Sequence, residues 1–189
     1  MRGPETEKSH ESRTTSGFYS KFMSGQGLDI GYSGGNPNAE PVLPTAIGVD
    51  FGYPGYDGKV LPFPDESRDY VFSSHCLEHI TDHYSAIKEW FRVVKTGGHL
   101  VIIVPHQFLY EKKMRPPSNW NLDHKRFYTP QKILHDIENS LQINSYRIVS
   151  LRDNDDNFDY AVPPQSHSGG AYEIELVIKR ITPPTWTLL

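Results

Sequence analysis

The strongest constraint on the fold is a strand–helix–strand pattern. Residues 99–104 (HLVIIV) form an unbroken apolar run, and residues 69–74 (DYVFSS) form an earlier one. Strands that are apolar throughout, rather than alternating, are typical of parallel sheets covered on both faces. Between them, residues 82–98 carry one apolar helical stripe and end at a Gly-Gly stop. The stripe consists of Ile87, Trp90, Phe91 and Val94. This pattern predicts a right-handed crossover unit of a parallel sheet.

Other segments extend this pattern along the chain. Thr129 and Pro130 predict the start of a second helix, as its N-cap and first helical position. An aromatic cluster predicts one further helical turn near the N-terminus, at Phe18, Tyr19 and Phe22. Short apolar runs predict further strands over residues 28–30, 46–50, 145–152 and 173–181.

The length and composition bound the domain organisation and the class of protein. Residues 1–16 are polar without an apolar period and are predicted to form a flexible tail, followed by a single domain over residues 17–189. A net charge of −4 argues against nonspecific nucleic-acid binding. The single cysteine, Cys76, excludes an internal disulfide and predicts a cytoplasmic location. No apolar run is long enough to span a membrane.

A glycine-rich turn follows the strand over residues 28–30. Glycines allow a sharp turn and a close approach of the backbone to a ligand. The next predicted strand ends at Asp50, about 20 residues after Asp29, where a carboxylate is placed to accept both hydroxyls of a ribose. The sequence therefore predicts a nucleoside-containing cofactor at the carboxyl edge of the sheet. Three prolines within residues 36–44 disfavour the phosphate-binding helix that a nicotinamide oxidoreductase needs.

Residues 27–105 resemble the class I S-adenosylmethionine-dependent methyltransferases of type 11. The first motif of that family, D-x-G-x-G-x-G, stands here as DIGYSGG, with Ser33 in place of the middle glycine. Later family motifs are matched by residues 57–80, by residues 92–105 (RVVKTGGHLVIIVP) and by residues 123–134 (DHKRFYTPQKIL). The last segment resembles one that is frequent in enzymes from polysaccharide and natural-product clusters.

The resemblance implies an α/β fold, the Rossmann-like fold of class I methyltransferases. We expect a largely parallel seven-stranded sheet whose last strand is antiparallel and lies inside the sheet, with reduced helices on one face. It also implies S-adenosylmethionine as the cofactor. The expected activity is O- or N-methylation of a small-molecule or saccharide-like acceptor. The alternative is a catalytically inactive binding or regulatory subunit, which the Ser33 substitution and the missing helices motivate.

The resemblance assigns the cofactor site residue by residue. Asp50 matches the ribose-binding acid, Asp57 faces the adenine amine with Gly58 as a backbone donor, and Ser74 and His75 lie near the methionine part. The full set of predicted cofactor residues is Asp29, Gly31, Ser33, Gly34, Gly35, Asp50, Phe51, Asp57, Gly58, Ser74 and His75.

Candidate catalytic residues lie after the predicted strand over residues 99–104. His106 follows that strand at the carboxyl edge, and His124 lies in the loop before the second helix. Either is a candidate base, with Asp123 as the orienting carboxylate. The structural alternative is that His124 holds the loop by hydrogen bonds. Aromatic side chains of an acceptor pocket, or of plain packing, are Tyr110, Trp120, Phe127 and Tyr128.

Two further expectations concern metals and partners. His75 to His79 spell H-x-x-E-H, and His83 follows at i+4, as in a metal-binding helix. The methyltransferase pattern explains Leu77, Glu78 and His79 without a metal, so none is predicted. An uncovered sheet face would be an apolar patch, so a homodimer or a hetero-complex is plausible.

Overall fold

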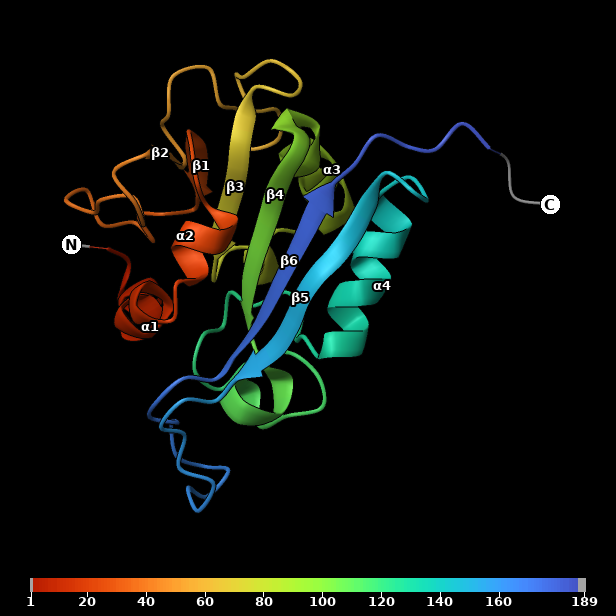
Figure 1. The fold of residues 1–189 in the computed structure, drawn as a ribbon. Helices are drawn as coiled ribbons and strands as arrows, with labels where there is room; N and C mark the ends of the chain where they lie inside the picture. The colour runs from red at the N-terminus through yellow and green to blue at the C-terminus, as the bar shows by residue number, and fades with distance from the viewer. Residues whose placement is uncertain (1, 187–189) are drawn as a thin grey trace.

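The computed structural model describes residues 2–186, which form a six-stranded sheet between two layers of helix and loop (Figure 1). The strand order is β2-β1-β3-β4-β6-β5. The strands are β1 (Gly27–Ile30), β2 (Ala46–Val49), β3 (Arg68–Ser74), β4 (Val94–Pro105), β5 (Tyr146–Asn154) and β6 (Glu173–Arg180). Strands β1 to β4 are parallel to one another. The predicted antiparallel last strand is confirmed, because β6 lies between β4 and β5 and is antiparallel to both.

The prediction of seven strands is wrong by one for the described residues. Residues 50–67, between β2 and β3, form turns and bends. Three prolines in this segment lack the backbone N–H that a ladder requires. These are Pro54, Pro62 and Pro64.

The larger of two apolar cores lies between the sheet and two amphipathic helices. Helix α3 (His83–Val93) contributes Ile87 and Trp90, and helix α4 (Pro130–Ser140) contributes Ile133. Both helices begin at a side-chain cap: Asp82 accepts a hydrogen bond from the Ser85 amide, and Thr129 accepts one from the Lys132 amide. The predicted crossover unit and second helix are therefore confirmed.

The predicted Gly-Gly helix stop is wrong. Helix α3 ends at Val93, and β4 continues through Gly97 and Gly98. A Cβ atom on Gly98 would lie 2.4 Å from the Asp69 carbonyl oxygen. The glycine is needed for the close approach of β4 to β3 rather than for the end of the helix.

The opposite face of the sheet carries less helix, as predicted. The short helix α2 (Phe18–Phe22) packs Tyr19 and Phe22 against side chains of β3 and β4. Between β1 and β2 the chain forms turns rather than a helix. At the edge strand β5, Ile148 and Val149 remain exposed.

Helix α1 (Pro4–Thr15) replaces most of the predicted flexible tail over residues 1–16. Its anchor is Arg13, which is 1% exposed and donates to Glu173 at 2.6 Å and to Glu175 at 2.8 Å. Ser9 also donates to Glu173, at 2.7 Å. Polar composition misled the prediction because the helix binds to two buried carboxylates rather than to an apolar surface.

Glu173 is the centre of this buried network. Burial alone would raise the pKa of its carboxyl group. The guanidinium of Arg13 and the hydrogen bond with His75 outweigh burial and lower the pKa to about 2. Glu173 is therefore ionised at neutral pH, and Arg13 neutralises it.

We predict that Arg13→Leu destabilises the fold by about 3–5 kcal/mol, because it leaves buried carboxylates without their cation. Urea unfolding measures the change. Arg147→Leu is the matched control, since Arg147 is exposed and, within residues 2–186, its side chain donates only to the neighbouring Tyr146 carbonyl. Equal midpoints for the two variants would contradict the anchoring role of Arg13.

Candidate active site

A cavity of about 440 Å³ opens at the carboxyl ends of β1 and β3. Five segments far apart in the chain form its wall. The lining residues are Gly3, Glu5 and Thr6 of the N-terminal segment; Gly31, Tyr32, Gly34 and Gly35 after β1; Asp50 and Phe51 after β2; Ser74, His75, Cys76, Glu78 and His79 after β3; and Tyr110, Asn121, Asp123 and His124 from the loops after β4. Most of the predicted cofactor and catalytic residues therefore meet in one place.

The glycine-rich turn forms the floor of this cavity. Gly31, Gly34 and Gly35 all have a positive φ, which favours glycine. A Cβ atom on Gly31 would lie 2.6 Å from Cys76 Sγ, whereas one on Gly34 or Gly35 would meet no atom within 4 Å. Gly31 is thus needed for packing, and the other two leave open space beside the cavity.

Asp50 lies at the edge of this turn, and the chain itself occupies much of its carboxylate. Oδ2 accepts from the Ser33 hydroxyl at 2.5 Å and from the Ser33 amide at 3.3 Å. Oδ1 accepts from the Phe51 amide at 2.8 Å. A carboxylate offers about four lone-pair positions, so Asp50 retains about one for a ligand. The neighbouring Phe51 ring is 88% exposed and lines the same cavity.

Asp29 lies away from the cavity, although the same motif contains it. Its carboxylate is buried and accepts a hydrogen bond from the Val42 amide at 2.6 Å. Burial raises its pKa to about 7, against the opposing effect of the Val42 hydrogen bond. Asp29 thus holds the loop between β1 and β2 in place.

Ser74 and His75 lie where β3 ends. Ser74 Oγ is buried, lines the cavity wall, and has no hydrogen-bond partner among the described residues. His75 has a φ of 51°, and its Nε2 lies 3.0 Å from Glu173. Burial would lower the pKa of His75, but the hydrogen bond and the negative charge of Glu173 outweigh it, so the pKa is raised.

Asp57 and Gly58 do not line this cavity. The Asp57 carboxylate accepts from the amides of Lys59 at 2.9 Å and Val60 at 2.7 Å, and so closes a local turn. A Cβ atom on Gly58 would lie 3.1 Å from the Phe51 ring, which connects this turn to the cavity rim. Their predicted contact with adenine stays a prediction.

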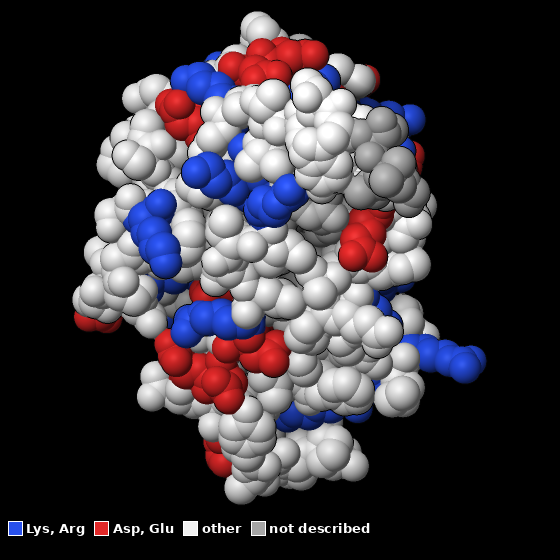
Figure 2. All heavy atoms as spheres, turned by 45° about the vertical axis from the view of Figure 1, so that its right-hand side comes forward, with Lys and Arg blue, Asp and Glu red and all other residues white. Residues whose placement is uncertain are grey.

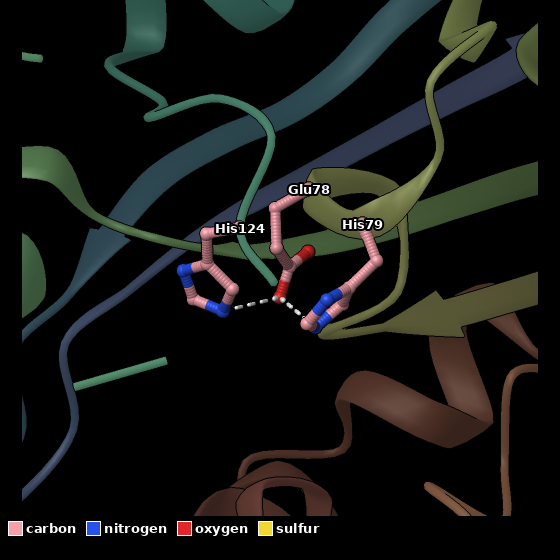
Figure 3. Close-up of side chains that lie close together, drawn as sticks. All are labelled: Glu78, His79 and His124. Atoms are coloured by element: carbon pink, nitrogen blue, oxygen red, sulfur yellow. Dashed lines mark ion pairs between the residues drawn. The ribbon is translucent and has the colours of Figure 1, made fainter. Parts of the chain in front are cut away.

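Two histidines at the other end of the cavity are each held by a carboxylate. His124 Nδ1 lies 2.5 Å from Glu111, and His79 Nδ1 lies 2.9 Å from Asp123. Asp123 therefore orients His79 rather than His124, which was its predicted partner. The buried Glu78 lies between the two rings (Figure 3).

His106 is not brought to the cavity. Its Nδ1 accepts from the amides of Phe108 and Leu109, which caps the short helix η2 (Gln107–Glu111). Burial lowers its pKa. Of the aromatic candidates, Tyr110 lines the cavity. Phe127 and Tyr128 line a second hollow of about 540 Å³ beside α4, which contains none of the predicted cofactor residues.

Sequence reasoning missed several cavity residues. Gly3, Glu5 and Thr6 belong to a segment predicted to be flexible, and Glu111 was not considered as a partner of His124. The run PETEK contains a proline followed by acidic residues, which is a helix-start signal that was available in the sequence. No comparable signal pairs Glu111 with His124.

The residues of the cavity fit a nucleoside cofactor with an amino-acid tail. The volume lies within the usual range for ligand sites, about 300–1,000 Å³. Asp50 can accept a further hydrogen bond, and the exposed Phe51 ring can stack against an adenine. The buried Ser74 hydroxyl has no hydrogen-bond partner among the described residues and can bind a ligand. Gly34 and Gly35 leave room for a ligand against the backbone.

Comparison with known proteins agrees with this fold. The family profile described as "Methyltransferase domain" matches residues 47–102. The chain is 27% identical over 138 residues to the ubiquinone/menaquinone biosynthesis C-methyltransferase UbiE of Vibrio parahaemolyticus, which covers 71% of this chain and 51% of the relative. A crystal structure of a SAM-dependent methyltransferase from Aquifex aeolicus matches with a TM-score of 0.59 at 13% identity, over 95% of this chain and 94% of that chain. The chain has the fold of the class I S-adenosylmethionine-dependent methyltransferases.

A further structural match contains a partner protein. It is a complex between the Haloferax volcanii Trm112 methyltransferase activator and the putative methyltransferase, with a TM-score of 0.59 at 14% identity over 94% of this chain and 92% of that chain. The resemblance predicted from the sequence is confirmed by the family profile, the curated relatives and the solved structures. This chain spans about half the length of the curated relatives that it matches.

We predict that Asp29 makes stability depend on pH. Its folded pKa of about 7 lies above the ordinary value of 3.8, so between these values the folded chain holds a proton that the unfolded chain has released. The free energy of unfolding should therefore fall as the pH rises through this window, by up to roughly 1.4 kcal/mol per unit of pKa difference.

Urea unfolding at pH 5 and pH 8 measures this effect, with Asp29→Asn as the reference. The asparagine side chain does not titrate, so the wild-type chain should lose about 2–3 kcal/mol relative to the variant between the two pH values. Parallel pH profiles would show that Asp29 is ionised in the folded chain at both.

Proposed function

We propose that this protein transfers the methyl group of S-adenosylmethionine to a small-molecule acceptor that carries an acidic O–H or N–H group. One observation carries the proposal. A single cavity joins a nucleoside-type end, with the glycine turn and Asp50, to an end with two carboxylate-held imidazoles, His79 and His124. A cavity of about 440 Å³ suits a compact acceptor, including a monosaccharide unit, once part of it holds the cofactor.

The cofactor end of the cavity binds S-adenosylmethionine and orients its methyl group. Asp50 accepts from ribose hydroxyls, Phe51 covers the adenine, and Ser74 donates to the amino-acid tail. When bound, the sulfonium supplies a methyl group that needs no activation by the protein. The protein therefore contributes mainly by holding donor and acceptor in line, which is a proximity effect.

The other end of the cavity receives the acceptor and handles its proton. Glu111 and Asp123 accept from the Nδ1 atoms of His124 and His79, which directs both Nε2 atoms away from these carboxylates. An imidazole held in this way is suited to accept the proton that the acceptor loses. The buried His124 is the candidate base, and the partly buried Asn121 and the Tyr110 ring border the same space.

The acceptor atom is the open part of this proposal. The Vibrio relative is named a C-methyltransferase of quinone biosynthesis. Methylation at carbon also needs an electron-rich, deprotonated acceptor, so the same base serves either reaction. We propose oxygen or nitrogen as the acceptor atom, in keeping with a polar acceptor end. Determining which atom of the product carries the label from isotopically labelled donor distinguishes these outcomes.

The face of the molecule drawn in Figure 2 favours a small-molecule acceptor over a nucleic acid. On the face shown in Figure 2, basic and acidic side chains are interspersed, and no broad basic area is visible among the described residues there. None of the helices within residues 2–186 has the length and apolar character that a membrane span requires. A cytoplasmic location stays a prediction from the single cysteine.

The second candidate is a binding or regulatory subunit. Ser33 engages the ribose-binding carboxylate, which favours weak cofactor binding by the isolated chain. The structure from Haloferax volcanii pairs a similar fold with an activator. On this proposal a partner completes the site, so methyl transfer would need a second chain.

We predict that S-adenosylmethionine binds and that Asp50→Ala weakens binding by about 10- to 100-fold, since a charge-assisted hydrogen bond contributes roughly 1.5–3 kcal/mol. Isothermal titration calorimetry measures the affinity. Asp159→Ala is the control, because Asp159 also accepts a backbone hydrogen bond, from Ala161, but lies outside the cavity. Asp57→Ala in the same series decides whether the predicted adenine contact forms. Binding unaffected by Asp50→Ala would contradict the assigned ribose site.

We predict that Ser33→Ala tightens cofactor binding by about 2- to 10-fold. The substitution removes the hydroxyl that lies 2.5 Å from Asp50 Oδ2 and returns a lone pair to the ribose, with a gain of roughly 0.5–1.5 kcal/mol. The comparison of wild type and variant in the same titration tests this. Weaker binding by Ser33→Ala would instead make the hydroxyl itself a cofactor ligand.

A further inference from the structure

Three side chains converge on the inner wall of the cavity in a way that the proposed methyl transfer does not require. Glu78 Oε1 lies 3.8 Å from His79 Nε2 and 3.9 Å from His124 Nε2 (Figure 3). The three candidate ligand atoms lie within 4.8 Å of one another. Glu78 is fully buried, and neither of its carboxylate oxygens has a hydrogen-bond partner among the described residues. A buried carboxylate without partners is costly unless a cation or a proton compensates it.

The hydrogen bonds made by the Nδ1 atoms of the two histidines also indicate that a cation belongs beside Glu78. Asp123 and Glu111 are acceptors, so the Nδ1 atoms of His79 and His124 donate to them. A neutral imidazole that donates from Nδ1 carries a lone pair on Nε2. Both lone pairs therefore face the same carboxylate oxygen, an arrangement that is repulsive when nothing lies between them. Metal-binding histidines almost always donate their other N–H to a carboxylate, a carbonyl or water in this way.

We propose that Glu78, His79 and His124 bind one divalent transition-metal ion of the zinc type at the acceptor end of the cavity. Two imidazole nitrogens and one carboxylate oxygen are a ligand set that such ions accept, with a further position open to the cavity. Ligand atoms around zinc lie about 3.4 Å apart in a tetrahedral arrangement, so side-chain shifts of up to roughly 1 Å close the site.

The structure changes the ligand set that the H-x-x-E-H pattern suggested. His75 Nε2 points to Glu173, and His83 Nε2 pairs with Asp136 at 3.1 Å. His124, from a loop far along the chain, takes the third position instead. The sequence predicted no metal because the methyltransferase pattern explained Leu77, Glu78 and His79 without one, and nothing in the sequence placed His124 beside them.

A competing explanation is that a proton, rather than a metal ion, compensates the buried Glu78 carboxylate. His75 Nδ1 also lies 3.8 Å from Glu78 Oε1. A protonated His75, His79 or His124 would compensate Glu78 without a metal. The proton account predicts no specific uptake of zinc.

The chemical role of the ion, unlike its binding, rests on the proposed function. An ion at this site would coordinate an acceptor oxygen and lower the pKa of its hydroxyl group. His79 and His124 would then hold the ion, and the acceptor would lose its proton to solvent or to a nearby carboxylate. This role narrows the acceptor to molecules with an oxygen that can coordinate a metal.

The test measures zinc bound to the full, untagged chain after chelator treatment and dialysis against Zn²⁺. We expect one tightly held ion per chain by elemental analysis. We expect Glu78→Gln and His124→Gln to weaken zinc binding at least about 100-fold, and Glu111→Gln to weaken it about 10- to 100-fold through its hold on His124. His83→Gln is the matched control and should retain the wild-type affinity, because His83 lies outside the cluster.

Circular dichroism of each variant shows whether it is folded. Should a variant unfold, nitrogen-15 NMR of the wild-type histidines keeps the test decisive: zinc should shift the Nε2 resonances of His79 and His124 and leave that of His83 unchanged. Absence of specific uptake, or equal zinc affinity in the wild-type chain and both ligand variants, would overturn the proposal and favour the proton account.

Calorimetry in the presence of chelator separates this proposal from the proposed function. Asp50, Phe51 and Ser74 are not among the ligands, so S-adenosylmethionine should still bind without the ion. If the wild-type chain binds S-adenosylmethionine but not zinc, the metal site is overturned and the proposed function stands. If it binds zinc but not S-adenosylmethionine, the proposed function is overturned and the metal site stands.

Discussion

The buried ionic network around Glu173 is the interaction on which the rest of this structure depends. Glu173 begins the strand that lies inside the sheet, and it contacts Arg13 of α1 and His75 of the cavity wall. One carboxylate thus connects the N-terminal helix, the sheet and the site. Burial of an unpaired carboxylate would cost too much desolvation free energy for the fold to tolerate. Glu173 is tolerated because the buried guanidinium of Arg13 neutralises it and because Ser9 and Asn154 donate two further hydrogen bonds to it.

The two acids of the glycine turn show how burial separates the roles of similar residues. Asp29 is buried, has a raised pKa, and is held by the Val42 amide. Asp50 lies at the cavity rim, where Ser33 and Phe51 donate to it. The first acid shapes the loop that replaces a helix, and the second remains available to a ligand. Reduction of the helices on this face is therefore compatible with a formed site, because side-chain hydrogen bonds fix the loops.

Carboxylates also determine the chemistry at the proposed acceptor end. Glu111 and Asp123 set the orientation and the tautomer of two imidazoles, and the fully buried Glu78 lies between their Nε2 atoms. This arrangement concentrates negative charge beside two lone pairs. The site is consequently suited to hold a cation or to take up a proton, and both are useful where an acceptor must become a nucleophile.

Patterns along the chain were sufficient to predict most of the sheet, the crossover helix and the glycine-rich turn that lines the cavity. These features depend on residues that are close together in the sequence. An unbroken apolar strand such as 99–104 needs cover on both faces of the sheet. A strand that runs into a glycine-rich turn can be recognised from that segment alone. The resemblance added the antiparallel last strand.

Only the tertiary structure decided features that depend on pairs far apart in sequence. Arg13 gains its partners 160 residues away at Glu173, which turns a polar segment into an anchored helix. His124 gains Glu111 and Glu78, and Asp123 turns to His79, whereas His106 caps a helix instead of reaching the cavity. Polar side chains carry no periodicity that reveals a distant buried partner, so sequence alone determined the scaffold and the glycine-rich turn after β1, and folding determined which charges meet.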